Sequence, residues 1–187
     1  MKTMKFTLHT KETAPEASRP VLDQVEKTYG FVPNLYAVFA ESPVAISSYF
    51  YISRQLMEHG ALSPQEQQIV MLAVSETNGC DYCVAAHSVA AVMSQVPKDT
   101  VQALREGREP SEPKHLALVR FAKAVLEHRG WVPETEQRAF LDAGYEIRHV
   151  LDVLSVIALK ILSNYTNHLA KTPLDHAFEP QRWSKKG

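Results

Sequence analysis

The feature that most constrains the fold of this chain is the regular recurrence of helix start and stop signals along its length. Serine followed closely by proline precedes several apolar segments of helical periodicity, and glycine follows them, as these residues do at helix ends. Ser63, Pro64 and Glu66 have the spacing of a capping box, in which serine and glutamate satisfy each other's backbone donors. Strand signals, such as the clean alternation of apolar and polar residues in a half-buried strand, are scarce in the sequence. The pattern therefore predicts an all-α fold.

These signals divide the chain into a series of expected helices. They cover about residues 18–30, 34–41, 42–60, 63–77, 80–96, 98–107, 111–130, 133–143 and 146–170. Residues 63–93 and residues 132–168 share an order of cap, helix, turn and helix, so both could be one helical hairpin used twice. The chain of 187 residues is long enough for one domain with a substantial core, and we expect a single domain over residues 1–187.

Charge and hydropathy argue against several classes of protein. A formal net charge of -1 gives no electrostatic footprint for nucleic acid, and the short basic tail at residues 182–186 does not change this. The most apolar stretch, residues 150–162, is interrupted by Asp152 and Lys160 and is shorter than the roughly 20 residues of a membrane span. Residues 1–6 lack the apolar run of a secretory signal. We therefore expect a cytoplasmic protein that binds neither nucleic acid nor a membrane.

The segment from Cys80 to His87 holds both cysteines of the chain and carries the chemistry. Cys80 and Cys83 are three residues apart and His87 follows four residues later, so on a helix the three side chains share one face. Two thiols in the first turn of a helix lie within reach of a disulfide. The helix N-terminus favours a thiolate and His87 can accept the thiol proton, whereas the carboxylate of Asp81 disfavours a thiolate. The pattern predicts a redox-active dithiol.

Two alternative roles for the cysteine pair stay open on the residues alone. The cysteines could be buried and inert, or they could belong to a zinc-binding or redox-sensing module. Against zinc, the segment supplies three ligands from a single helix, whereas a structural zinc site requires four and gathers them from separate segments. No cofactor-binding pattern is present elsewhere in the sequence.

The segments 62–64 and 78–87 resemble those of the AhpD-like alkyl hydroperoxidases in the carboxymuconolactone decarboxylase superfamily. The similarity covers a core of about residues 33–95, and residues 164–175 are similar to the peroxidase-related branch. The resemblance implies an all-α subunit that assembles into homotrimers or homohexamers and reduces organic hydroperoxides in antioxidant defence. It also implies a thioredoxin-like or lipoyl-type reductant. The apolar density of residues 146–162 agrees with burial against neighbouring subunits.

The resemblance assigns a role to each residue of the matching segment. Cys83 would attack the peroxide, Cys80 would resolve the sulfenic acid, and His87 would serve in the proton relay. The family's relay usually includes a glutamate twelve residues before the first cysteine, where this chain has Gln68. Glutamine orients a water or an imidazole but does not carry a proton.

Glu66 and Glu76 are the nearby carboxylates that could replace the missing relay group, although Glu66 is better explained by the capping box. A second activity within the superfamily is decarboxylation of a lactone. That reaction needs no cysteine pair, so the two cysteines favour the peroxidase interpretation.

Overall fold

The computed structural model describes residues 4–185, which fold into helices without any strand. Residues 1–3 of the N-terminal stretch and Lys186 of the basic tail lie outside the described residues. The elements in chain order are the short 3-10 helix η1 (Glu16–Ser18), α1 (Arg19–Tyr29), α2 (Asn34–Phe39), α3 (Pro43–His59), α4 (Pro64–Thr77), α5 (Asp81–Met93), α6 (Lys98–Arg105), α7 (Pro113–Glu127), α8 (Glu134–Asp142), α9 (Ile147–Ala170) and the 3-10 helix η2 (His176–Gln181). The all-α prediction is confirmed, and the expected helices are present within a few residues at each end.

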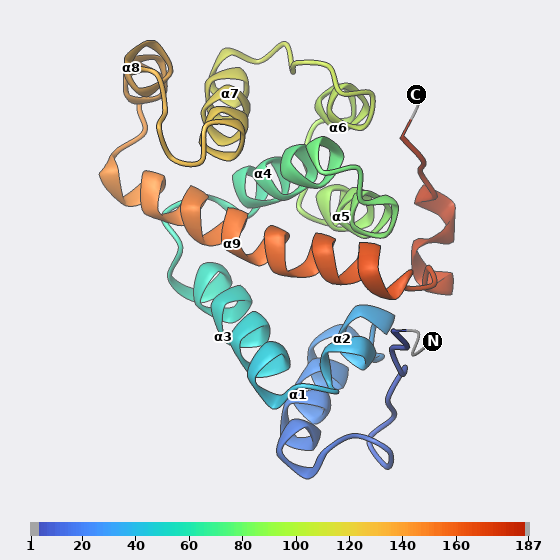
Figure 1. Cartoon of the computed structure of the whole chain (residues 1–187). Coiled ribbons are helices and arrows are strands. Elements are labelled where there is room, and N and C mark those ends of the chain that lie inside the picture. The colour runs from blue at the N-terminus through green and yellow to red at the C-terminus, as the bar shows by residue number, and fades with distance from the viewer. Residues whose placement is uncertain (1–3, 186–187) are drawn as a thin grey trace.

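The long helix α9, with 24 residues, crosses the middle of the molecule and separates two groups of helices (Figure 1). Helices α4 to α8 lie on one side of it, and α1 to α3 lie on the other. Helix α9 packs against α4, α3 and α5, while the C-terminal element η2 packs against α5. This arrangement places α5, which begins directly after Cys80 and contains Cys83, against both α9 and η2.

Residues with strong positional preferences begin and end these helices as the sequence indicates. The Ser63 Oγ accepts a hydrogen bond from the Glu66 amide at 3.2 Å, and Glu66 Oε2 accepts one from the Ser63 amide at 2.9 Å. The predicted capping box is therefore present at the start of α4. Gly79 has a φ of 67°, a left-handed conformation that favours glycine, in the tight turn that joins α4 to α5.

The helix α4 is the centre of the core. Ile69, Val70, Leu72 and Val74 are fully buried, and the helix contacts α5, α6, α7 and α9. Helices α4 and α5 form the first expected hairpin. Helix α8 packs chiefly on α7 and not on α9. Helices α8 and α9 therefore do not form a hairpin like that of α4 and α5.

Two charged residues interrupt the apolar sequence of α9, and both have buried or partly buried partners. Asp152 Oδ2 accepts hydrogen bonds from the backbone amides of Ala61 at 2.5 Å and Leu62 at 3.0 Å. These contacts tie α9 to the loop between α3 and α4. Lys160 is almost fully buried, and its partners belong to the thiol site.

The outer face of α9 remains apolar and exposed. The side chains on it are those of Ile147, Leu151, Leu154, Ile161, Tyr165 and Leu169. Helices α3, α4 and α5 cover the inner faces of α9. No helix within residues 4–185 is both long and apolar enough to cross a membrane.

Replacing Asp152 by alanine tests whether its carboxylate holds the loop before α4. Asp152→Ala leaves two backbone amides without their acceptor, which is expected to lower the free energy of unfolding by about 1–3 kcal/mol. Denaturant titration monitored by circular dichroism measures the change. Asp142→Ala, at an exposed position of α8, is the control and should change stability by less than about 0.5 kcal/mol. Equal effects of the two substitutions would contradict this role.

Candidate redox site

The turn between α4 and α5 sets the positions of the two cysteines. Cys80 is the residue before the first turn of α5, and its amide donates to the Ser75 carbonyl oxygen at 2.9 Å. Cys83 lies in the first turn of α5. Both cysteines are free thiols and only 1% exposed.

A single amide group on α9 contacts both sulfur atoms. Asn167 Nδ2 donates to Cys83 Sγ at 3.2 Å and to Cys80 Sγ at 3.8 Å. Ser163 Oγ lies 3.9 Å from Cys83 Sγ. The two thiols therefore lie side by side beneath α9, as their spacing predicts.

Helix α9 supplies a polar face in an otherwise apolar region. Lys160, Ser163, Asn164 and Asn167 follow the i, i+3, i+4, i+7 spacing of one helix face, and each is at most 5% exposed. Asn164 is held from the other side, because its Oδ1 accepts from Asn78 Nδ2 at 2.9 Å. Buried polar groups remain stable when they are hydrogen-bonded, so this face fixes the position of α9 over the thiols.

His87 connects α4 to α9, and within residues 4–185 its side-chain hydrogen bonds go to Gln68 and Lys160 and not to a sulfur atom. Its Nδ1 lies 3.0 Å from Gln68 Oε1, and its Nε2 lies 2.6 Å from Lys160 Nζ. Burial and the Lys160 charge lower the pKa of His87 well below its ordinary value, so the imidazole is neutral. Because the ammonium of Lys160 has no lone pair, Nε2 accepts its hydrogen bond and Nδ1 donates to Gln68. Gln68 thus holds the imidazole in one tautomer.

The two thiols differ in acidity. Burial opposes ionisation of Cys83, but the hydrogen bond from Cys80 and the charge of Lys160 lower the pKa of Cys83 below its ordinary value. The hydrogen bond to Cys83, burial and the negative charge on Cys83 raise the pKa of Cys80. These directions favour a thiolate on Cys83 and a protonated thiol on Cys80.

The two carboxylates considered for a proton relay have other partners. Glu66 accepts from Tyr145 Oη at 3.0 Å and pairs with Lys114 Nζ at 3.0 Å, besides closing the capping box. Although burial opposes it, the hydrogen bonds from Ser63 and Lys114 lower the pKa of Glu66 to about 2, so this carboxylate stays ionised.

Glu76 forms ion pairs on the other side of α4. Its carboxylate lies 3.9 Å from Lys123 Nζ and 3.6 Å from Lys185 Nζ. These cations explain why an acidic residue is kept at the C-terminal end of a helix, where the helix dipole disfavours it. Over residues 4–185, neither Glu66 nor Glu76 has a hydrogen bond or ion pair with a residue of the thiol site.

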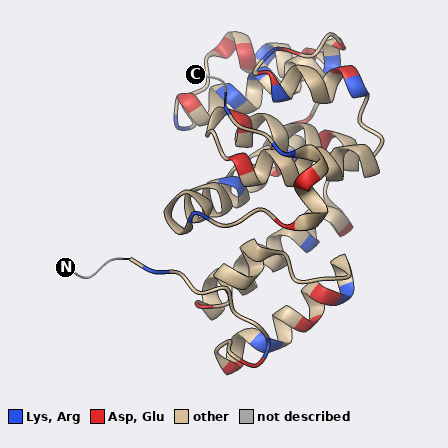
Figure 2. Cartoon of the chain, turned by 90° about the vertical axis from the view of Figure 1, so that its right-hand side faces the viewer, with Lys and Arg blue, Asp and Glu red and all other residues tan. Residues whose placement is uncertain are grey.

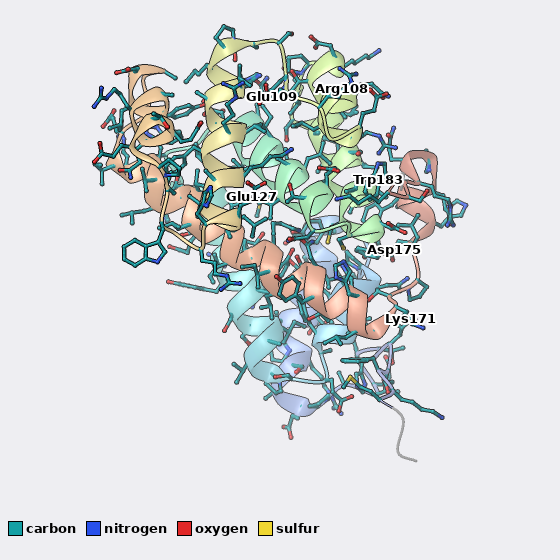
Figure 3. The ribbon with its side chains drawn as sticks, turned by 45° about the horizontal axis from the view of Figure 1, so that its top comes forward. Arg108, Glu109, Glu127, Lys171, Asp175 and Trp183 are labelled. Atoms are coloured by element: carbon teal, nitrogen blue, oxygen red, sulfur yellow. The ribbon has the colours of Figure 1, made fainter. Side chains whose placement is uncertain are left out.

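The C-terminal segment holds the thiol-bearing helix from outside. Tyr82, between the two cysteines, donates from its hydroxyl to Asp175 Oδ2 at 2.5 Å, and its ring packs edge-on against Phe178. Trp183 Nε1 donates to the Arg105 carbonyl oxygen at 2.7 Å. Figure 3 shows Asp175 and Trp183 on the segment that follows α9. Tyr82 is thus a packing residue in this structure.

Lys160, Ser163 and Asn167 are the site residues that the sequence patterns did not identify. Lys160 was apparent only as an interruption of an apolar stretch. The signal for the group is the helical spacing of Lys160, Ser163, Asn164 and Asn167, because four polar residues on one face of an apolar helix require buried partners.

Within residues 4–185, no group of three or more His, Cys, Asp or Glu side chains is placed to hold a metal ion.

Acidic and basic residues are mixed along the helices in the view of Figure 2.

Comparison with known proteins finds similarity to one protein family and to several solved structures. Residues 47–126 match the model of the "Carboxymuconolactone decarboxylase family". No match was found among curated proteins.

Several solved structures share the fold over nearly the full length. An uncharacterized peroxidase-related protein with an alkylhydroperoxidase AhpD core, from Ralstonia eutropha JMP134, is 23% identical, with 95% of each chain covered and a TM-score of 0.82. An uncharacterized peroxidase-related protein from Silicibacter sp. TM1040 is 18% identical, with 97% of this chain and 98% of that chain covered and a TM-score of 0.77. The debrominase Bmp8 is 17% identical, with 97% of each chain covered and a TM-score of 0.77. Residues 47–126 are thus similar to the carboxymuconolactone decarboxylase family, and the chain has the AhpD-like helical fold of these solved structures.

Proposed function

We propose that this protein is a thiol-dependent reductase of organic hydroperoxides in which Cys80 and Cys83 alternate between dithiol and disulfide. The observation that carries the proposal is the pair of adjacent, unequal thiols under one amide of Asn167. A low pKa at Cys83 supplies the nucleophile, and a high pKa at Cys80 keeps the second thiol protonated until it is needed.

The chemistry needs two steps in the protein. The Cys83 thiolate attacks the terminal oxygen of the hydroperoxide, the O–O bond breaks, and the alkoxide that leaves takes up a proton to become an alcohol. Cys83 is then a sulfenic acid. The Cys80 sulfur attacks Cys83, the S–O bond breaks, and the thiol proton leaves with the hydroxyl group as water. An external dithiol, thioredoxin-like or lipoyl-type, returns two electrons and two protons to the disulfide.

A polar atom beside the sulfurs supports substrate binding at this place. Asn167 Oδ1 is buried and has no hydrogen-bond partner among the described residues. A hydroperoxide O–H group is a donor, so it would satisfy this acceptor while its oxygen lies near Cys83. We propose that Asn167 orients the substrate as well as the thiols.

The proposed roles of the relay residues follow from their contacts. His87 reaches the thiol site through Lys160, and Gln68 fixes its tautomer without carrying a proton. We propose that His87 and Lys160 together exchange protons with the thiol site, and that Glu66 and Glu76 have structural roles.

Substitution of each cysteine distinguishes the two thiols. Cys83→Ser should reduce consumption of an alkyl hydroperoxide in the presence of excess dithiol at least about a hundredfold, because serine is not ionised at neutral pH. Cys80→Ser should still react once and then accumulate a sulfenic acid on Cys83, which dimedone labels and mass spectrometry detects. Both variants must retain the parent's circular dichroism spectrum. Consumption at the parental rate by both variants would end the peroxidase proposal.

The same assay separates the peroxidase from its alternatives. A solved structure of the debrominase Bmp8, as a cysteine variant, contains 2,3,4-tribromopyrrole, so this compound and a lactone acid belong in the substrate panel. Turnover of either compound, without consumption of hydroperoxide, would show that this compound and not a hydroperoxide is the substrate. Stoichiometric oxidation without turnover would favour a redox sensor.

The pH at which the thiolate forms gives a second test. The ultraviolet absorbance of a thiolate should persist at neutral pH and be lost as the pH falls through a midpoint below the ordinary value for cysteine, because the folded-state pKa of Cys83 is lowered. Cys83→Ser should abolish this transition, whereas Cys80→Ser should retain a thiolate. A transition only in the alkaline range would show that Cys83 is an ordinary thiol.

The exposed face of α9 supports assembly into a homotrimer or homohexamer. Leu151, Leu154 and Tyr165 are 59%, 41% and 51% exposed and lie on the same side of the helix as Ile147 and Leu169. A continuous exposed apolar face marks an interaction surface, and we propose that a second copy of the chain covers it.

Leu151→Glu is expected to reduce the molecular mass in solution toward that of one subunit, because a charge would be buried in the interface. Sedimentation velocity measures the mass. Val44→Glu, at an exposed position of α3, is the control and should leave the mass unchanged. A parent protein that sediments as a monomer would contradict the assembly.

A further inference from the structure

The cation that faces the thiol site has no anionic carboxylate of its own. Lys160 is 1% exposed, and no carboxylate within residues 4–185 forms an ion pair with it at 4.0 Å or less. A buried charge without compensation is strongly unfavourable, so a buried ammonium requires an opposite charge close to it. A negative charge on Cys83 favours the ammonium of Lys160 and could balance it.

The neighbours of Lys160 come from several helices. Tyr49 of α3, and Cys80 and Cys83 at the start of α5, lie close enough to influence its pKa. His87 of α5 contacts it directly, and the uncharged Gln68 of α4 contacts His87. Burial raises the pKa of Tyr49, so this phenol is neutral. His87 is neutral as well. Although burial opposes it, the negative charge on Cys83 raises the pKa of Lys160.

We propose that Lys160 is a redox-linked positioning residue, which balances the Cys83 thiolate in the reduced protein and releases its proton when the disulfide forms. This inference rests on the dithiol–disulfide cycle proposed above and adds a proton to it. When Cys83 and Cys80 join, the negative charge of the thiolate disappears. The ammonium would then be a buried cation without a counter-charge, and the neutral amine is the favoured form.

The balance of the half-reaction follows from these charges. Reduced protein carries one thiolate, one thiol and one ammonium; oxidised protein carries one disulfide and one amine. Oxidation therefore releases two electrons and two protons, one from Cys80 and one from Lys160. If Lys160 kept its proton, only the proton of Cys80 would be released.

The structure provides a route for the second proton. His87 Nε2 accepts the hydrogen bond of Lys160 at 2.6 Å, and the imidazole is partly exposed, unlike the thiols. The ring can accept the lysine proton at Nε2 and pass a proton to solvent. In the reverse direction the same route returns a proton when a dithiol partner reduces the disulfide.

The equilibrium with glutathione tests this proton count in the whole protein. Reduction of glutathione disulfide consumes two electrons and two protons, which matches the proposed oxidation of the protein. The equilibrium constant should therefore be independent of pH from about pH 6 to about pH 7.5, where the glutathione thiol stays protonated. If Lys160 kept its proton, the equilibrium constant for oxidation of the protein would fall tenfold for each unit by which the pH rises. Alkylation of the quenched mixtures and mass spectrometry measure the constant.

Two substitutions of Lys160 give opposite expectations. Lys160→Arg keeps the cation but cannot release its proton, so its constant should fall tenfold per pH unit. For Lys160→Met, the equilibrium constant should be independent of pH, because both thiols are then protonated. For the same reason this variant should lack the ultraviolet absorbance of a thiolate at neutral pH. Lys98→Met, at an exposed position of α6, is the control and should behave as the parent.

The parent alone makes the test decisive even where a variant fails to fold. A constant that falls tenfold per pH unit in the parent, or no thiolate in the reduced parent, overturns the role of Lys160 while leaving the disulfide cycle intact. An equilibrium constant of Lys160→Arg that does not change with pH also overturns the role of Lys160, because another group would then supply the proton. Failure of the parent to form any disulfide overturns the proposed function itself.

Discussion

The arrangement of the site depends on the packing of one polar helix face against two buried thiols. Lys160, Ser163, Asn164 and Asn167 lie on the inner side of α9, in a region where the rest of the helix is apolar. Such groups are costly to bury unless each finds a partner, so they specify one position of α9 along the α4–α5 hairpin. The same contacts hold the two sulfurs beneath one amide group, which joins the stability of the fold to the geometry of the site.

The chemical asymmetry of the thiols follows from charge and not from exposure. Cys80 and Cys83 are equally buried, and burial disfavours a thiolate on either of them. The hydrogen bond that Cys80 gives to Cys83, and the nearby ammonium of Lys160, favour the negative charge on Cys83. In the proposed cycle, the buried cation of Lys160 lowers the pKa of Cys83, whereas other reactive cysteines owe a low pKa to a partly exposed, electropositive environment.

The change from glutamate to Gln68 becomes understandable in this setting. A carboxylate at this position could receive the proton of His87, but Gln68 offers only a carbonyl oxygen to Nδ1. Its effect is to fix the imidazole so that Nε2 faces Lys160. The proposed proton exchange therefore runs between His87 and Lys160, on the opposite side of the ring from Gln68.

Local sequence patterns were sufficient for the helices and for the dithiol, and insufficient for the contacts between distant segments. Ser63 and Glu66 predicted a capping box because both partners lie within one turn. The spacing of Cys80 and Cys83 placed the thiols together for the same reason. Lys160 lies in a helix far along the chain, and nothing in a single sequence states that α9 packs on α5.

The most direct measurement of the central claim is the mass of the intact protein after one equivalent of an alkyl hydroperoxide. The proposed dithiol–disulfide cycle predicts the loss of two hydrogen atoms and the formation of one equivalent of alcohol, both within the time in which the thiolate absorbance disappears. An unchanged mass with the hydroperoxide intact, or oxygen added to the cysteines without a disulfide, would contradict it.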